Sequence, residues 1–168
     1  MKIAKLRNVK TPNRGTEKSA GIDFYTPKFD DQFIKDFQEL NKSSFCIESM
    51  VVYKEIQLKP QQRVLIPSGI KVNFEGEPKA LMGVNKSGIG VKKGLSLLAK
   101  LVDQDYTGEI FINMVNTGNE TVTIDEDSKI TQFVLVPVFY DDIEEVDIES
   151  LYEKETQRGS GAMGSTGV

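Results

Sequence analysis

The sequence predicts an all-β protein of the jelly-roll, sandwich or barrel class, with its strands concentrated after Glu55. Short runs rich in β-branched and aromatic residues recur along this part of the chain, as in strands. Stretches rich in Gly, Pro, Asn and Asp separate them and predict turns. Many short strands at such spacing are typical of sandwiches and barrels. A chain of 168 residues is long enough for one domain with a hydrophobic core, so one domain over residues 1–157 is expected.

Five stretches carry the strand signal, at residues 55–60, 63–74, 109–116, 121–125 and 129–140. Within the second, Ile70, Val72 and Phe74 alternate with polar residues, as a half-buried strand requires. The run 133–139 is almost continuously apolar. It predicts a central strand that ends at Pro137 or bulges there.

One segment with a different period interrupts the sequence before these strands, at residues 30–42. Its apolar side chains fall on one face of a helix behind an aspartate N-cap: Phe33, Ile34, Phe37 and Leu40. We expect a short inserted amphipathic helix. Its apolar face is expected to pack on the chain's own sheet, and the alternative is that the face binds a protein partner.

The segment 141–155 is strongly acidic, with eight acidic residues and one basic residue. Apolar residues are spaced through it at Ile143, Val146, Ile148 and Leu151. An extended or partly helical arm that lies over another surface and a solvated linker explain this pattern equally well.

Composition excludes several classes of function. With 21 basic and 25 acidic residues the net charge is −4, so no overall positive field favours nucleic acid or an anionic membrane. No window of about 18 apolar residues is present, and a soluble cytoplasmic protein is expected.

The chain has no histidine, which excludes Ser-His-Asp and Cys-His catalysis and His-ligated zinc. The lone Cys46 has no partner, so carboxylates, Tyr and Lys remain as acid-base candidates.

The stretch LVDQDYTGEIFI contains a pair of aspartates, Asp103 and Asp105, before Gly108. A strand is expected to turn into a hairpin here, and a spacing of two on a strand would direct both carboxylates to one face. One carboxylate could act as a general base for water, or both could be turn formers. Two carboxylates near hydroxyl groups could also bind Mg²⁺.

Two other stretches suit an anionic ligand. In GVNKSGIGVKKGL, Lys86 and Ser87 precede two glycines, and the pattern predicts a turn whose cation, hydroxyl and backbone amides hold an anion. The glycine-rich stretch 158–168, RGSGAMGSTGV, has Ser165 where a phosphate-binding loop would have lysine. It is either a disordered tail or a flexible phosphate-binding segment.

Taken in order, five stretches resemble the five motifs of the trimeric deoxyuridine triphosphatase (dUTPase) family: SAGIDFYTP, NKSGIGVKKGL, LVDQDYTGEI, SKITQFVLVPV and RGSGAMGSTG. The resemblance covers roughly residues 19–27, 66–138 and 158–168. It implies a jelly-roll-like fold assembled as a homotrimer, with active sites at the subunit interfaces. It also implies hydrolysis of dUTP to dUMP and pyrophosphate with Mg²⁺ bound mainly through the substrate phosphates. Such a reaction limits uracil in DNA and supplies dUMP for dTMP synthesis.

The resemblance assigns roles within the third motif. Asp103 is similar to the aspartate that activates water for attack on the α-phosphorus. Tyr106 matches the tyrosine that stacks under the deoxyribose and leaves no room for a 2′-hydroxyl. The backbone around Leu101 and Val102, and at Phe111, matches the groups that contact the uracil edge.

Other matched residues concern the phosphates. Lys86, Ser87 and Gly88 resemble the motif that holds the α- and β-phosphates, and Gln132 matches a phosphate-contacting glutamine. Asp23 matches an aspartate that contacts the magnesium ion through water.

The tail is similar to a segment that closes over a neighbouring subunit's site, onto the β- and γ-phosphates. The residues concerned are Arg158, Gly161, Met163, Gly164, Ser165 and Thr166. The sequence departs from the family pattern with Met163 in place of a phenylalanine over the base, Lys86 in place of an arginine, and Lys100 in place of a glycine. Two other functions are compatible with the same fold. One is a nucleotide-sensing regulatory protein that binds a partner through residues 30–42, and the other is a dCTP deaminase.

Overall fold

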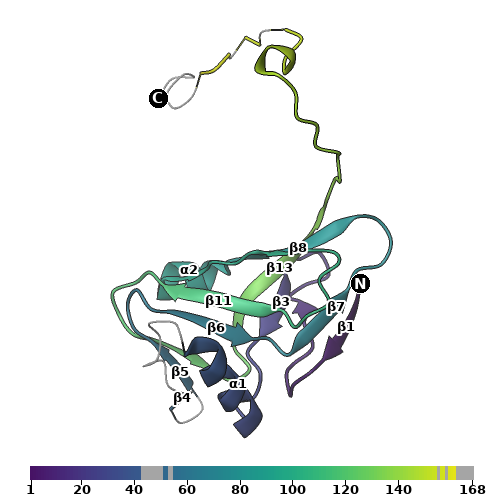
Figure 1. Ribbon diagram of the computed structural model, residues 1–168. Coiled ribbons are helices and arrows are strands. Elements are labelled where there is room, and N and C mark those ends of the chain that lie inside the picture. Colours follow the sequence, from purple (N-terminus) through teal and green to yellow (C-terminus); the bar gives the residue numbers. More distant parts are fainter. Residues whose placement is uncertain (43–50, 53–54, 155, 158, 162–168) are drawn as a thin grey trace. The chain divides into compact units, whose positions relative to one another are not determined.

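The computed structural model describes residues 1–42, 51–52, 55–154, 156–157 and 159–161. The chain divides into two compact units, Met1–Val138 and Phe139–Val168, and each is described by itself (Figure 1).

Strands form most of the first unit (Figure 1). Their bounds are β1 Lys2–Lys5, β2 Asn13–Arg14, β3 Ile22–Tyr25, β4 Val51–Val52, β5 Glu55–Leu58, β6 Arg63–Pro67, β7 Ile70–Asn73, β8 Lys79–Val84, β9 Leu95–Leu97, β10 Leu101–Val102, β11 Phe111–Asn116, β12 Val122–Asp125 and β13 Lys129–Pro137. The helices of this unit are α1 Asp31–Asn41 and α2 Ser87–Lys93.

The strands pair antiparallel in four sheets, with the orders β10-β8-β13-β3-β2, β6-β11-β9, β12-β5-β4 and β1-β7. Their buried apolar side chains form one hydrophobic core. The sheets of the described residues do not close into a barrel. A β-sandwich of the jelly-roll class, one of the architectures that the sequence predicts, fits this arrangement.

The strand prediction after Glu55 is confirmed, and β13 lies between β8 and β3 and ends at Pro137 as expected. Strands before Glu55 were not predicted. In β3 every side chain is buried, including Asp23 and Tyr25, so the alternation of polar and apolar residues that indicates a half-buried strand is missing there.

Helix α1 confirms the predicted helix at residues 30–42. The Asp30 side chain accepts a hydrogen bond from the Phe33 backbone N–H at 2.9 Å, which satisfies one of the free donors at a helix start. Phe33 and Phe37 are fully buried in the core. The apolar face is therefore used within the chain, and a protein partner at residues 30–42 would have to bind the polar face.

The end of α1 is fastened to strand β6. Asn41 donates from Nδ2 to the Leu65 carbonyl at 2.9 Å, and its Oδ1 accepts from the Leu65 N–H at 2.9 Å. Strand β6 is at the edge of its sheet. Asn41 thus supplies this edge with the hydrogen bonds that a neighbouring strand would make.

The turn predicted after Lys86 is wrong, because residues 87–93 form helix α2. Glycines weaken helix signals in a sequence, which explains the error. The helix ends at Gly94, where φ is +65°, and a Cβ there would lie 2.8 Å from the Gly118 nitrogen. Only glycine fits this position. No helix in the described part of the chain is long and apolar enough to cross a membrane.

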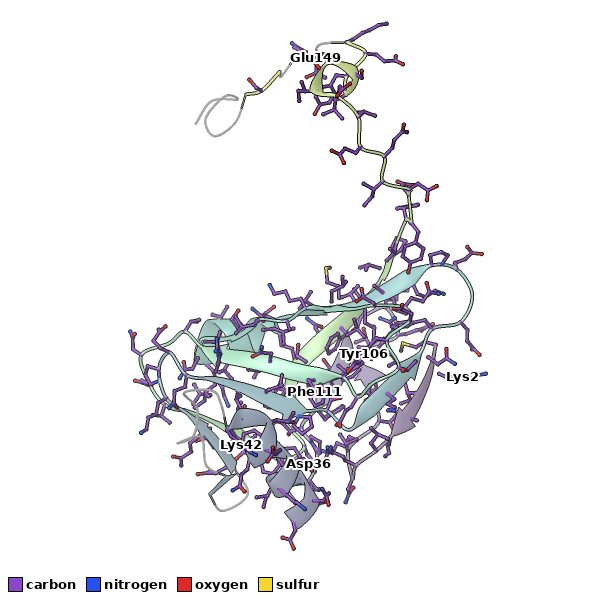
Figure 2. All side chains as sticks on the ribbon, viewed as in Figure 1. Lys2, Asp36, Lys42, Tyr106, Phe111 and Glu149 are labelled. Carbon is purple, nitrogen blue, oxygen red and sulfur yellow. The ribbon has the colours of Figure 1, made fainter. Side chains whose placement is uncertain are left out.

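The second unit contains the acidic segment 141–155. Its described residues include a 3₁₀ turn, η1, at Ile148–Ser150, which contains the labelled Glu149 in Figure 2. Ile143 and Tyr152 are exposed. An arm that lies over another surface and a solvated linker both stay predictions for this segment.

Candidate active site

A cavity of about 180 Å³ lies beside the segment that joins β10 to β11. The lining residues are Ala99, Leu101, Val102, Asp103, Tyr106, Ile110, Phe111 and Phe133. They include every residue of the third motif that the resemblance assigns to the nucleotide. The fold therefore gathers these side chains and backbone groups around one space.

The joining segment is not the hairpin that the sequence suggests. Strand β10 pairs with β8, with Leu101 opposite Met82, whereas β11 pairs with β6 and β9. The segment therefore crosses from one sheet to another. The expectation that both aspartates share one face is wrong for the same reason: Asp103 lines this cavity, and Asp105 lines a different pocket of about 400 Å³ beside β1 and β7.

Tyr106 is held firmly within this turn. Its N–H donates to the Asp103 carbonyl at 3.2 Å, and its hydroxyl donates to the Glu109 carbonyl at 2.8 Å. The ring lies across Gly108, where a Cβ would come within 2.3 Å of the tyrosine oxygen. The side chain stays 40% exposed, so part of the ring is available to a ligand. Tyr106 and Phe111 are labelled in Figure 2.

The apolar side of the cavity is rigid. The rings of Phe133 and Phe24 are 4.6 Å apart between centroids, and both are buried. A Cβ at Gly83 would lie 2.4 Å from Leu97 and 3.1 Å from Phe133. Lys100 accepts the Gly83 N–H through its carbonyl at 2.6 Å, and it does not line the cavity.

A second cluster forms around Asp23, which is only 4% exposed. The Lys86 ammonium contacts Asp23 Oδ1, and the Lys129 Nζ lies 2.9 Å from Oδ2. Gln132 is opposite Asp23 in the β13–β3 pairing and donates to the Asn85 carbonyl at 3.3 Å. The structure thus brings together Asp23, Lys86 and Gln132, as the resemblance suggests.

Lys129 was missed by the sequence analysis. It lies three positions before Gln132 in the stretch SKITQ. Its place in the same predicted strand as Gln132 is the feature of the sequence that could have indicated it. Its ammonium also lies 5.6 Å from the centroid of the Tyr25 ring, within the range of a cation–π interaction.

The electrostatics of Asp23 follow from its two lysines. Burial alone would raise the pKa of this carboxyl, but hydrogen bonds and charge from Lys86 and Lys129 outweigh burial and lower the pKa below its usual value. The same contact raises the pKa of Lys129. Both carboxylate oxygens therefore face ammonium groups, an arrangement that does not fit direct coordination of a metal ion. The described residues contain no group of three or more acidic, Cys or His side chains that could hold one.

Gln132 is positioned by its neighbour across the sheet. A Cβ at Gly21 would lie 2.1 Å from the Gln132 Oε1, so the glutamine side chain lies directly over this glycine. Ser87 and Gly88 open helix α2 and are exposed. A Cβ at Gly88 would meet nothing within 4 Å, which leaves the backbone there accessible.

The Phe133 side chain at the cavity and the Gln132 side chain at the Asp23 cluster lie on opposite faces of the largest sheet. Gln132 and Phe133 are consecutive residues of β13, so their side chains point in opposite directions. Phe133 lines the cavity, whereas Gln132 is paired with Asp23.

The predicted tail residues are mostly outside the described part of the chain. Arg158, Met163, Gly164, Ser165 and Thr166 fall there. Gly161 is described and belongs to the second unit.

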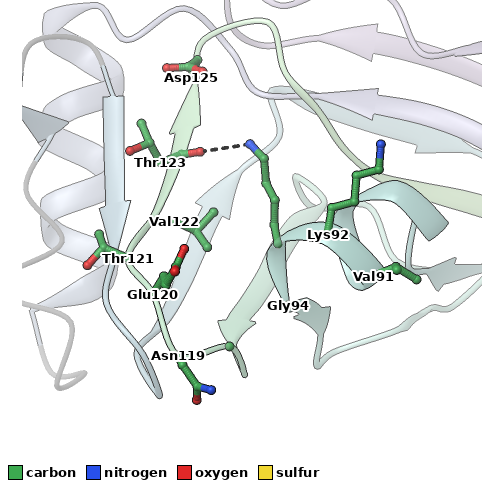
Figure 3. Close-up of a pocket in the computed structure, with 11 residues that line it drawn as sticks. Val91, Lys92, Gly94, Asn119, Glu120, Thr121, Val122, Thr123 and Asp125 are labelled. Atoms are coloured by element: carbon green, nitrogen blue, oxygen red, sulfur yellow. Dashed lines mark hydrogen bonds between the residues drawn. The ribbon is translucent and has the colours of Figure 1, made fainter.

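A larger pocket of about 560 Å³ lies elsewhere, between the end of α2 and β12 (Figure 3). Lys93 reaches across it to the Thr123 carbonyl at 3.5 Å. None of the residues assigned to the nucleotide lines this pocket.

Comparison with solved structures supports the fold. A dUTPase of Staphylococcus bacteriophage 80alpha with dUPNHPP aligns with a TM-score of 0.74 and 20% identity, covering 99% of this chain and 98% of that one. A mutant dUTPase from phage phi11 of S. aureus, described with a structural Mg(II) ion, aligns with a TM-score of 0.68 and 18% identity, covering 91% and 98%.

Comparison of sequences shows the family as well as the fold. The deoxyuridine 5′-triphosphate nucleotidohydrolase of Laribacter hongkongensis is 38% identical over 115 residues, which cover 67% of this chain and 74% of that protein. The protein of the same name from Bdellovibrio bacteriovorus is 34% identical over 140 residues, covering 80% and 87%. The dUTPase family model matches residues 39–167. With this match over most of its length, the chain belongs to the dUTPase family.

Proposed function

We propose that this protein hydrolyses dUTP to dUMP and pyrophosphate. The observation that carries the proposal is the cavity lined by Asp103, Tyr106 and Phe111. The related proteins of Laribacter and Bdellovibrio are named for the same reaction.

The cavity suits the base and sugar of the nucleotide. Tyr106 is anchored at both its N–H and its hydroxyl, so a ring held in this way can refuse a 2′-hydroxyl by steric exclusion. The Leu101 side chain pairs with Met82 across β10 and β8 and is 62% exposed. We propose that its backbone, with that of Val102 and Phe111, contacts the uracil edge.

Asp103 is the proposed general base. Its side chain is exposed at the cavity, where water can reach it. The carboxylate accepts a proton from the attacking water, the new bond forms at the α-phosphorus, and the bond to the bridging oxygen breaks to release pyrophosphate.

The Asp23 cluster is the proposed phosphate site. Lys86, with Ser87 and Gly88, binds the α- and β-phosphates, and Gln132 adds a side-chain donor. Cations and donors placed in advance stabilise the charge that develops on a transferring phosphoryl group. Because both Asp23 oxygens face ammonium groups, Mg²⁺ enters with the triphosphate as part of the substrate, and Asp23 meets it only through water.

We further propose a homotrimer with its sites at subunit interfaces. Phe133 of the cavity and Gln132 of the Asp23 cluster point in opposite directions from β13, which supports a nucleotide site that takes its cavity from one copy and its phosphate groups from another. An apolar surface supports this assembly: Met82 is 39% exposed on the face that carries Gln132, and it lies between Val134 and Leu101. Exposed patches of this kind mark association surfaces.

The tail completes the proposed site. We assign residues 158–168 to a segment distinct from the domain of residues 1–157. It closes over the β- and γ-phosphates in a neighbouring subunit through Arg158, Gly161, Met163, Gly164, Ser165 and Thr166. Ordering such a segment costs about 1–2 kcal/mol per residue, which a ligand with many charged contacts can offset.

The first test measures substrate choice. The full chain is incubated with dUTP, dCTP, dTTP and UTP in the presence of Mg²⁺, and pyrophosphate is measured. We expect a clear preference for dUTP. Release of ammonia from dCTP would instead indicate a deaminase, and equal rates for the four nucleotides would contradict the proposal.

The second test concerns the base. Asp103→Asn should lower kcat by about 10²-fold or more with little change in KM, because it removes the proton acceptor and leaves the cavity shape unchanged. Asp105→Asn is the matched control, since Asp105 lines the other pocket, and it should retain nearly full activity. Unchanged turnover in Asp103→Asn would remove this residue from the mechanism.

A further inference from the structure

An ionic cluster connects the beginning of the chain, the inserted helix and the nucleotide-binding turn. Arg7 donates from Nε to Glu109 Oε1 at 3.0 Å and from Nη2 to Oε2 at 3.2 Å. Its Nη1 lies 2.7 Å from Asp36 Oδ2 on α1. The Arg7 and Glu109 side chains are only 13% and 11% exposed. Bidentate pairs of this kind fix geometry as well as charge.

Glu109 belongs to the turn that carries Tyr106. Its carbonyl accepts the Tyr106 hydroxyl at 2.8 Å, and its Oε1 also accepts the Gly69 N–H at 2.6 Å. The next residue, Ile110, donates its N–H to the Ile70 carbonyl at 2.9 Å. The side chain of Glu109 is therefore fixed by Arg7 and Gly69, while its backbone anchors the tyrosine.

Position 69 has no room for a side chain beside Arg7. Gly69 has φ of +73°, and a Cβ there would lie 3.0 Å from the Arg7 Cβ. Burial lowers the pKa of Arg7, but the hydrogen bonds that Arg7 donates to Glu109 and Asp36 outweigh burial and raise the pKa. The hydrogen bond from Arg7 also lowers the pKa of Asp36. Arg7 and Asp36 are thus charged at neutral pH, and the Arg7 guanidinium contacts the carboxylates of both Asp36 and Glu109.

We propose that Arg7 and Glu109 are positioning residues that hold Tyr106 against the sugar of the substrate, and that Asp36 makes the inserted helix α1 part of this clamp. The proposal rests on the proposed function, since it concerns the same cavity. The clamp does not touch the reacting atoms. It sets the orientation of the tyrosine ring, and through the ring the discrimination between deoxyribose and ribose.

The kinetic test uses Arg7→Met, Glu109→Gln and the double variant. Glu109→Gln keeps an acceptor for Gly69 and removes the charge that binds Arg7. Each single variant should raise KM for dUTP by about tenfold, with kcat changed less than about twofold, and should lower the preference for dUTP over UTP. The double variant should be no worse than the more impaired single variant, because both changes break the same contact between Arg7 and Glu109.

Asp36→Asn tests the contribution of the helix, and Glu39→Gln is its control. Glu39 is one turn away on α1 and pairs with Lys42 instead. We expect a rise of roughly threefold in KM for Asp36→Asn, because a salt bridge on the half-exposed side of the clamp contributes less. Glu39→Gln should leave KM unchanged. Equal effects of the two substitutions would contradict the assignment of α1 to the clamp.

Hydrogen exchange without nucleotide tests the clamp independently of the reaction. Glu109→Gln should speed amide exchange in residues 104–110 and at Gly69, while residues 129–137 exchange as in the unsubstituted protein. If the protein shows no dUTP hydrolysis but this exchange pattern holds, the proposed function fails and the clamp remains. Unchanged exchange together with unchanged KM overturns the clamp. Should Arg7→Met fail to fold, the near-isosteric Glu109→Gln and Asp36→Asn carry the test.

Discussion

Asp23 has two roles: it forms a buried ion-paired cluster in the fold, and it orients lysines that we propose bind the substrate. Its carboxylate is buried and held by Lys86 and Lys129. A buried carboxylate is tolerated only when it is paired, and here the pairing also holds the Lys86 ammonium beside Gln132. A triphosphate would meet lysines that are already oriented.

The pKa of Asp23 predicts a dependence of stability on pH. Hydrogen bonds and charge from Lys86 and Lys129 outweigh burial and hold its pKa in the folded protein below the usual value for an aspartate. A lowered pKa contributes stability that is present above the unfolded-state value and is lost as the pH falls through the folded-state value. We therefore expect the free energy of unfolding to fall more steeply below about pH 4 in the unsubstituted protein than in Asp23→Asn.

Chemical denaturation between about pH 6 and pH 3 measures this difference. Asp105→Asn removes an exposed carboxylate and should give a curve parallel to that of the unsubstituted protein. If Asp23→Asn also gives a parallel curve, the two lysines do not stabilise the charged form of Asp23.

Among the elements, helix α1 is joined to the sheets both by its apolar face and by hydrogen bonds from its last residue. Phe33 and Phe37 fill the core, and Asn41 fastens the helix end to the edge strand β6. An edge strand left open is a site for unwanted pairing. The helix therefore covers a sheet edge as well as part of the core.

Asn41→Ala should lower the free energy of unfolding by about 1–3 kcal/mol, because it leaves the Leu65 N–H and carbonyl without these partners. Urea denaturation measures the change. Gln38→Ala, at an exposed position of the same helix, should change stability by no more than about 0.5 kcal/mol. Equal stability of the two variants would show that the Asn41 hydrogen bonds contribute nothing net.

Local sequence rules succeeded for α1 and failed for α2 and for the turn after β10. Helix α1 has an N-cap and a clear apolar stripe, so its signal is contained in consecutive residues. Helix α2 has no buried residues and contains two glycines, so neither periodicity nor propensity indicates it. The pairing of β10 with β8 depends on residues 81–82, which local turn chemistry does not reveal.

For the whole molecule, the apolar surface around Met82 has a testable consequence. Met82→Glu should reduce the mass measured by light scattering from that of a trimer to that of a smaller species, because a charge on an association surface opposes contact. Val91→Glu is the control, since Val91 is 86% exposed on α2, and it should leave the mass unchanged. A trimer that persists in Met82→Glu would place the interface elsewhere.

The sequence by itself determined the β class, the helix at residues 30–42, the central strand ending at Pro137 and the identity of the motif residues, because these depend on short-range periodicity and on residue order. The tertiary structure decided which of these residues meet. Arg7 and Glu109 are 102 positions apart, and Lys129 reaches Asp23 only through strand pairing. Contacts of this kind depend on which distant segments become neighbours in the sheets, and a local pattern of residues does not specify those neighbours.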